Sequence, residues 1–163
     1  MNVVDIWAEA AGLFTGKKDE YPSIDFVNLT SDEMHAVIVF LLQQAREGSF
    51  NFRLARDKQV GVIVSSPEVV SRAFLSGEII GAMGLDFRTM PAIVFYLQAT
   101  DMLTVSYARG EWNALQAIMF FDLLYQIKTL TPTAEILPDD FYFTYDERLL
   151  FVDVWQAYLN GKK

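Results

Sequence analysis

The chain has 163 residues, of which 52% are hydrophobic and 21% charged, a composition typical of a single folded domain with a sizeable core. Its formal net charge of −8 argues against non-specific nucleic-acid binding, which requires clustered lysine and arginine. The sequence contains no cysteine, which excludes disulfides, thiolate nucleophiles and thiolate metal sites. The lack of cysteine also fits a reducing compartment.

The sequence favours neither a secretory leader nor a membrane partner. Asp5 and Glu9 interrupt Met1–Phe14, where a leader would need an unbroken apolar core. The uncharged run Met34–Ala45 contains histidine and glutamine and is much shorter than the roughly 20 residues that cross a bilayer. We therefore expect a cytoplasmic protein.

The first part of the chain predicts two helices separated by a strand. Apolar residues recur every three or four positions in Val3–Phe14, which indicates an amphipathic helix. Ile24–Val27 is a short strand candidate. Thr30 and Glu33 have the spacing of a capping box, which begins a largely apolar helix that we expect to continue to about Arg46.

The middle of the chain predicts two strands and a short helix. The range Phe50–Leu54 alternates apolar and polar residues, as a half-buried strand does, and Val60–Val64 indicates a more buried strand. A helix is expected to begin at Pro67 and to end near Leu75. The glycines in Glu78–Leu85 weaken both a helical and an extended assignment, so this stretch stays open.

The second half predicts a hairpin followed by two helices. Ala92–Leu97 and Met102–Tyr107 are apolar strand candidates joined by a short polar turn, and Pro91 stands at the entrance of the first. The range Trp112–Lys128 indicates the clearest helix of the chain, and a final helix is expected around Glu147–Leu159.

This order of proline, hairpin, glycine and helix resembles the second half of a thioredoxin-like domain. Arg88 and Pro91 fall on the Arg-x-x-Pro loop of that family, in which the proline is cis, so the resemblance implies a cis bond between Met90 and Pro91. The stretch Phe87–Leu115 also weakly resembles the hydrogenase-maturation chaperones, cysteine-free proteins of the same fold.

The resemblance extends backwards to the strand Ile24–Val27 and the helix after it, and it implies that Phe50–Arg56 is the central strand that follows this helix. In this alignment Asp25 takes the place of a buried carboxylate of the family. The positions of the two active-site cysteines are occupied by Ser31 and Met34, which implies a redox-inactive member.

The expected fold class is α/β, with a thioredoxin-like central mixed sheet flanked by helices. We expect a thioredoxin-like domain over 1–130 with an insertion at about 57–85, and a helical extension over 131–163 packed on the same domain. Without the family alignment, the order of elements also suits a roadblock-like or longin-like module, a small α/β scaffold that dimerises.

The sequence offers little catalytic chemistry. His35 is the single histidine, so a metal site built from several histidines is excluded. Ser31 and His35 could share a helix face and would be the basis of a hydrolase, but no third orienting group is visible. No phosphate-binding loop or dinucleotide fingerprint occurs. We therefore expect no enzymatic activity and no cofactor or metal.

We interpret the chain as a non-enzymatic protein-binding module, used as an adaptor, chaperone or complex subunit, whose partner is another protein or an extended peptide. The alternative is an acidic inhibitor or immunity protein that blocks a basic enzyme surface, and a homodimer also stays open. Whether the aromatic residues of the tail belong to the core or to an interface is left open by the sequence. The candidate partner-binding residues are Ser31, Met34, Arg88, Thr89, Met90, Pro91, Phe141, Tyr142 and Tyr145.

Overall fold

A computed structural model describes residues 3–16, 19–44, 47–63 and 66–162, which form a seven-stranded sheet and five helices. The α/β class is thus confirmed. The helices are α1 (Val3–Phe14), α2 (Ser31–Gln44), α3 (Pro67–Leu75), α4 (Ala114–Leu130) and α5 (Tyr145–Gly161). The strands are β1 (Ser23–Val27), β2 (Glu47–Leu54), β3 (Asp57–Val62), β4 (Ile79–Asp86), β5 (Ile93–Ala99), β6 (Met102–Tyr107) and β7 (Glu135–Pro138).

The sheet has the strand order β3-β2-β4-β5-β6-β1-β7, and every neighbouring pair is antiparallel. The prediction of a mixed sheet is therefore wrong. Short connections join β2 to β3, β4 to β5 and β5 to β6, and such hairpins can only produce antiparallel pairs. The longer crossovers through α2, α3 and α4 each join two strands that are not neighbours in the sheet.

Two specific features implied by the thioredoxin resemblance are not found. The Met90–Pro91 bond is trans, so the predicted cis bond is wrong. The chain turns here through Arg88, which has a φ of 63° and donates its backbone N–H to the carboxylate of Asp86. In addition, β4, β5 and β6 separate β1 from β2, which was expected to be the central strand.

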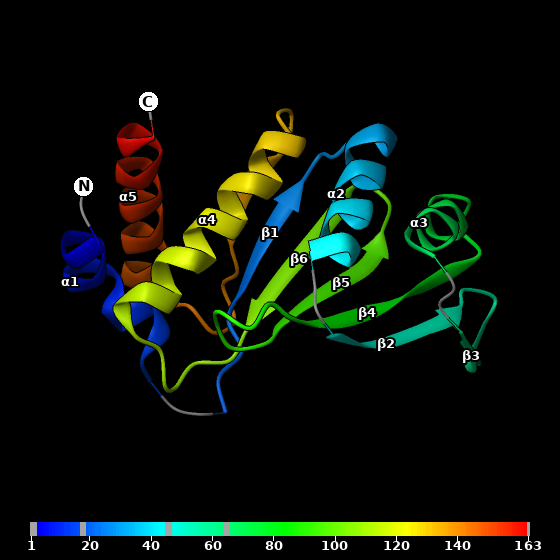
Figure 1. Cartoon of the computed structure of the whole chain (residues 1–163), viewed down its shortest axis with the longest axis horizontal. Helices are drawn as coiled ribbons and strands as arrows, with labels where there is room; N and C mark the ends of the chain where they lie inside the picture. Colours follow the sequence, from blue (N-terminus) through cyan, green and yellow to red (C-terminus); the bar gives the residue numbers. More distant parts are fainter. Residues whose placement is uncertain (1–2, 17–18, 45–46, 64–65, 163) are drawn as a thin grey trace.

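One face of the sheet carries the core and the other carries partly exposed side chains. In β5, Phe95 and Leu97 are buried, whereas Tyr96 between them is exposed. Figure 1 shows α4 and α2 in front of the sheet, with α1 and α5 beside α4 at one end and α3 beside α2 at the other. The structure is therefore a two-layer arrangement in which α2 and α4 cover the apolar face.

Most predicted elements are found close to their expected places. The helices at Val3–Phe14 and Pro67–Leu75 match α1 and α3, and the hairpin matches β5 and β6. The expected buried strand at Val60–Val64 corresponds to β3, an exposed edge strand with a single neighbour, and Val64 lies outside the described residues. The range Glu78–Leu85, left open by its sequence, largely coincides with β4.

The segment expected as an insertion and the C-terminal tail both contribute to the same sheet. Residues 57–85 supply β3, α3 and most of β4, which pairs with β2 on one side and with β5 on the other. In the tail, β7 was not predicted, and it pairs with β1 at the sheet edge. α5 packs against α1 and α4.

Aromatic rings fill the core at the end of the molecule where α1, α4 and α5 meet. The Phe14 ring lies 4.9 Å from the Trp112 ring and 5.2 Å from the Tyr107 ring, measured between centroids. Phe121 of α4 stacks on Trp155 and Tyr158 of α5. Trp155 and Tyr158 thus belong to the core, which was one of the two interpretations that the sequence left open for the aromatic residues of the tail.

A buried arginine joins three segments at this end of the molecule. The Arg109 guanidinium lies 2.8 Å from Glu20 and 3.0 Å from Glu147, measured from nitrogen to carboxylate oxygen. It also lies over the Phe143 ring, 5.5 Å from its centroid. Glu147 is in the first turn of α5, so this ion pair fixes the start of that helix next to the end of β6.

The fold leads to a prediction about two glycines in the sheet. A Cβ added to Gly81 of β4 would contact the Asn51 carbonyl and come within 2.8 Å of the Phe52 Cα, both backbone atoms of β2. We expect Gly81→Ala to lower the free energy of unfolding by about 1–3 kcal/mol or more. A Cβ added to Gly61, in edge strand β3, has no atom within 4 Å, so Gly61→Ala should change the free energy of unfolding by less than about 1 kcal/mol. Urea unfolding of both variants checks this, and equal losses would contradict the described β2–β4 pairing.

Candidate functional site

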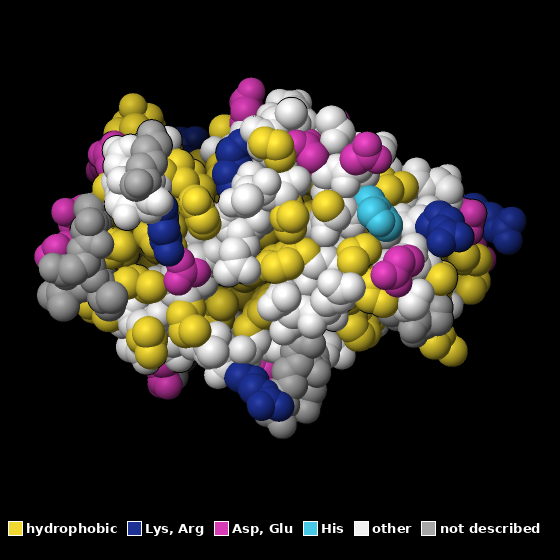
Figure 2. All heavy atoms as spheres, turned by 45° about the horizontal axis from the view of Figure 1, so that its top comes forward, with side chains coloured by type: hydrophobic (Ala, Val, Ile, Leu, Met, Phe, Trp, Pro, Cys, Tyr) yellow, Lys and Arg dark blue, Asp and Glu magenta, His cyan; other side chains and the backbone are white. Residues whose placement is uncertain are grey.

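A groove lies between α2 and α4 and is closed at one side by the loop between β4 and β5. Its volume is about 280 Å³. Figure 2 shows hydrophobic side chains gathered in the hollow between these two helices. The residues that line the groove are Phe40, Gln44, Phe87, Thr89, Met90, Met119, Asp122, Leu123 and Gln126.

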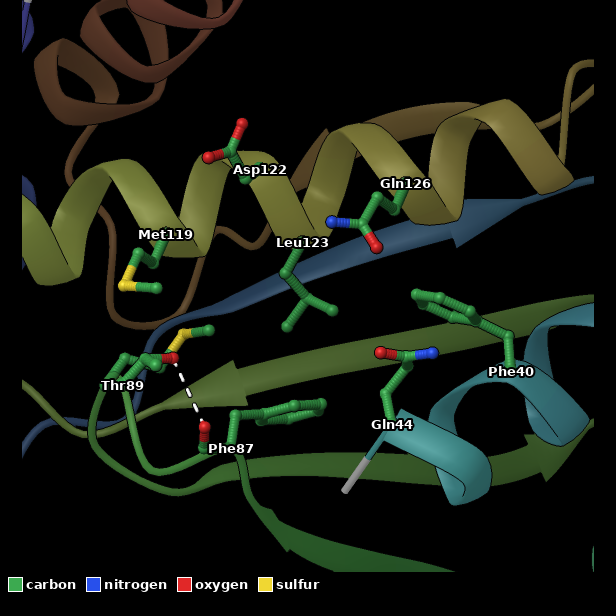
Figure 3. Close-up of a pocket in the computed structure, with 9 residues that line it drawn as sticks. Phe40, Gln44, Phe87, Thr89, Met119, Asp122, Leu123 and Gln126 are labelled. Atoms are coloured by element: carbon green, nitrogen blue, oxygen red, sulfur yellow. Dashed lines mark hydrogen bonds between the residues drawn. The ribbon is translucent and has the colours of Figure 1, made fainter. Parts of the chain in front are cut away.

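The groove has an apolar interior and an amide on each wall. In Figure 3, Leu123 points into the space between the helices, while Phe40 and Phe87 flank it. The amides of Gln44 and Gln126 point toward one another across the groove, and neither has a hydrogen-bond partner among the described residues. The groove can therefore hold an apolar group and offer amide hydrogen bonds beside it.

The carboxylate of Asp122 lies at the rim, where other side chains already engage it. The Tyr158 hydroxyl donates to Asp122, and the Lys162 ammonium lies 2.7 Å from the same oxygen. Burial and the hydrogen bond to Asp122 raise the pKa of Tyr158 to about 12, so its hydroxyl stays protonated at neutral pH. Among the described residues that line the groove, Asp122 is the one ionisable side chain.

The start of α2 is attached to the loop that follows α4. Thr30 and Glu33 form the predicted capping box, because the Thr30 N–H donates to Glu33 and the Glu33 N–H donates to the Thr30 hydroxyl. The Glu33 carboxylate also accepts hydrogen bonds from the backbone and the hydroxyl of Thr133, at 2.9 and 2.6 Å. This contact spans 100 positions in the sequence and places α2 relative to α4.

The predicted residues of the loop before β5 lie at this groove. Thr89 and Met90 line it, with Met90 buried and Thr89 exposed. Arg88 is exposed on the same loop, and Pro91 is half-buried next to Met90. None of the predicted partner-binding residues lies on the facing wall of the groove, which Leu123 and the other groove residues of α4 supply.

The predicted residues at the start of α2 are not part of the groove. Ser31 is exposed in the first turn of the helix, and Met34 is completely buried in the core. The Nδ1 atom of His35 lies 2.7 Å from the hydroxyl of Ser71 in α3, and His35 makes no hydrogen bond to Ser31. Since Ser71 is fully buried, this pair is a contact between helices rather than an accessible nucleophile and base.

Two further sequence candidates lie elsewhere. The Asp25 carboxylate accepts a hydrogen bond of 2.6 Å from the Thr104 hydroxyl, as a neighbour across the β1–β6 pair. In the tail, Phe141 is 83% exposed and Tyr145 is 66% exposed, whereas Tyr142 is half-buried. Neither set lines the groove.

The facing wall of the groove had only a weak signal in the sequence. The helix after Thr30 was expected to be apolar almost all round, and Phe40 belongs to that apolar surface. Leu123 shares one side of its predicted helix with other apolar residues, and Gln44 and Gln126 have no pattern that distinguishes them from solvated glutamines. The sequence alone does not show that these residues of α2 and α4 face each other, because this depends on how the two helices pack in the fold.

The described residues contain no cluster of three or more histidine, cysteine, aspartate or glutamate side chains that could hold a metal ion. Within the same residues, no helix is both long enough and apolar enough to cross a membrane.

Comparisons with known proteins do not assign this chain to a family. No protein-family model matches the sequence, and no curated protein is significantly similar to it. A solved structure of the toxic C-terminal tip of CdiA from Pseudomonas aeruginosa in complex with immune protein contains a similar chain, with 13% identity and a TM-score of 0.45. The similarity covers 68% of this chain and 79% of that chain, and it is too low to support a conclusion on fold or function.

The attachment of α2 leads to a prediction about acid stability. Burial alone would raise the pKa of Glu33, but hydrogen bonds from Thr133 and Thr30 outweigh it and hold the pKa below its usual value of 4.5. A carboxyl with a lower pKa in the folded chain stabilises it above the unfolded-state pKa, and this contribution is lost as the pH falls through the folded-state pKa. We expect Glu33→Gln to cost about 1–3 kcal/mol near neutral pH.

The difference between wild type and Glu33→Gln should shrink as the pH falls from about 5 to about 3, because the wild-type carboxylate becomes protonated. Urea unfolding at a series of pH values measures this difference. Glu135→Gln, at an exposed position of β7, is the matched control and should behave as the wild type does. A difference that stays constant with pH would contradict the assigned role of the Glu33 carboxylate.

Proposed function

We propose that the protein is a non-enzymatic protein-binding module whose groove between α2 and α4 receives an apolar side chain of a partner segment. The observation that carries this proposal is the composition of the groove, an apolar interior with free amides on facing walls. An apolar pocket with a few placed polar groups is a usual form of binding site. A glutamine amide can pair with a peptide unit of the partner while the apolar side chain enters the groove.

Two observations support binding over catalysis. The carboxylate of Asp122, the one carboxylate among the described residues that line the groove, is engaged by Tyr158 and Lys162. Ser71, whose hydroxyl contacts the single histidine, His35, is buried between α2 and α3, where a substrate has no access. The proposal does not depend on a thioredoxin-like platform, because the groove is defined by α2, α4 and the loop before β5.

A second candidate function is an acidic inhibitor that blocks a basic surface of another protein. The net charge of −8 favours it, since opposite charges speed the encounter of two proteins. Both functions are forms of protein binding, and they differ in which surface meets the partner.

The groove can be tested with peptides selected from a random library displayed on phage. We expect selected peptides to carry an apolar anchor and to lose at least about tenfold in affinity when Thr89→Arg places a long cation at the groove. Thr100→Arg, at an exposed position of the β5–β6 turn, introduces the same side chain outside the groove and should leave affinity unchanged. Fluorescence anisotropy measures both affinities, and thermal melts check folding.

Peptides whose affinity falls equally in both variants, or in neither, would contradict the groove as the binding site. A selection that returns no binding peptide would contradict the proposed function itself.

A further inference from the structure

The C-terminal part of the chain concentrates exposed apolar side chains. Twelve large hydrophobic residues are exposed in the described part of the chain, and five of these lie within residues 135–161. They are Leu137, Phe141, Tyr145, Leu149 and Val152. Isolated exposed hydrophobic residues need no explanation, whereas a concentration of them marks an interaction surface.

Three of these residues form a stripe on α5. Tyr145, Leu149 and Val152 are spaced by four and three positions, so they lie on one face of the helix. The opposite face of α5 packs into the core through Val154 and Trp155. The stripe therefore points away from the core, and Figure 1 shows α5 beside α1 at the end of the helical layer opposite α3.

The stripe is presented by an ordered backbone rather than by a loose tail. The Asp139 carboxylate accepts the backbone N–H groups of Phe141 and Tyr142 at 2.8 and 2.9 Å, which fixes the turn that exposes Phe141. At the start of α5, the capping box of Thr144 and Glu147 and the ion pair of Glu147 with Arg109 hold the helix in place. Binding here would need little ordering of the backbone.

The same segment carries most of the net charge. Residues 135–161 contain six acidic side chains and one basic one, a net charge of −5 out of −8 for the whole chain. Asp146 and Asp153 are exposed and directly follow Tyr145 and Val152, so they line one side of the stripe. The one basic residue, Arg148, is half-buried and lies over the Tyr145 ring.

We propose that this acidic, apolar surface of α5 docks on a basic surface of another protein that supplies apolar anchors of its own. This inference rests on the proposed protein-binding function and names the chemistry of the partner. Charge complementarity decides the occupant, because lysine and arginine of a partner would meet the aspartates beside the stripe. A second copy of this chain would bring the same negative charge against it, and a nucleic acid or an anionic membrane would be repelled.

The probe for this surface is a labelled helical peptide made of leucine and lysine, with its leucines on one face. We expect it to bind the wild type, with an affinity that falls steeply as salt rises, since exposed charges are screened at high ionic strength. Two matched peptides serve as controls, one with glutamate in place of lysine and one with serine in place of leucine. Both controls should bind at least about tenfold more weakly.

Paired variants separate this surface from the rest of the molecule. Leu149→Gln should weaken binding of the leucine–lysine peptide by at least about tenfold, whereas Leu115→Gln, at an exposed leucine of α4, should have little effect. The double variant Asp146→Asn/Asp153→Asn should weaken binding and flatten its salt dependence. The control variant Glu68→Gln/Asp101→Asn changes the net charge by the same amount at exposed positions elsewhere. It should change neither the affinity nor its salt dependence.

The inference is overturned if the glutamate peptide binds as well as the lysine peptide, or if both charge variants weaken binding equally. It is also overturned if Thr89→Arg abolishes binding while Leu149→Gln does not, because the peptide then occupies the groove and only the proposed function stands. Sedimentation of the wild type as a dimer that Leu149→Gln dissolves would assign the stripe to a second copy and likewise contradict the inference. Thermal melts of all variants exclude loss of folding as the cause.

Discussion

The carboxylate of Glu33 determines how α2 sits against α4. It accepts hydrogen bonds from Thr30 at its own helix start and from Thr133 in the loop after α4, so the two helices are joined at this end. A buried carboxylate is tolerated there only because donors compensate its lost hydration. Beyond this joint, Phe40 of α2 and Leu123 of α4 face one another across the groove rather than closing it.

A second buried charge has the same role at the other end of the helical layer. Arg109 pairs with Glu20 and Glu147, which attaches the start of α5 to the end of β6. The aromatic side of α5 packs on Phe121, so the outer side of the helix has no place in the core. The groove therefore depends on the Glu33–Thr133 hydrogen bonds, and the α5 surface depends on the Arg109–Glu147 ion pair. A substitution could disrupt one of these contacts and leave the other in place.

Local signals predicted most helices and the hairpin, because caps and periodicity act over a few residues. They could not predict the sheet order, which depends on pairings between distant strands, and the resemblance based on Pro91 led to a cis bond and a mixed sheet that are not found. The loop residues Thr89 and Met90, which the sequence analysis proposed for partner binding, line the groove. Their partners on α4, such as Gln126, became visible only once the fold brought the two helices together.

The methionines offer the most direct measurement of the central claim, that the groove binds a partner. Met90 and Met119 line the groove, whereas Met34 and Met83 are completely buried and do not line it. In NMR spectra of protein labelled with ¹³C at the methionine methyl groups, a bound peptide should shift the Met90 and Met119 signals and leave those of Met34 and Met83 in place. Binding that leaves both groove signals unchanged would contradict the account.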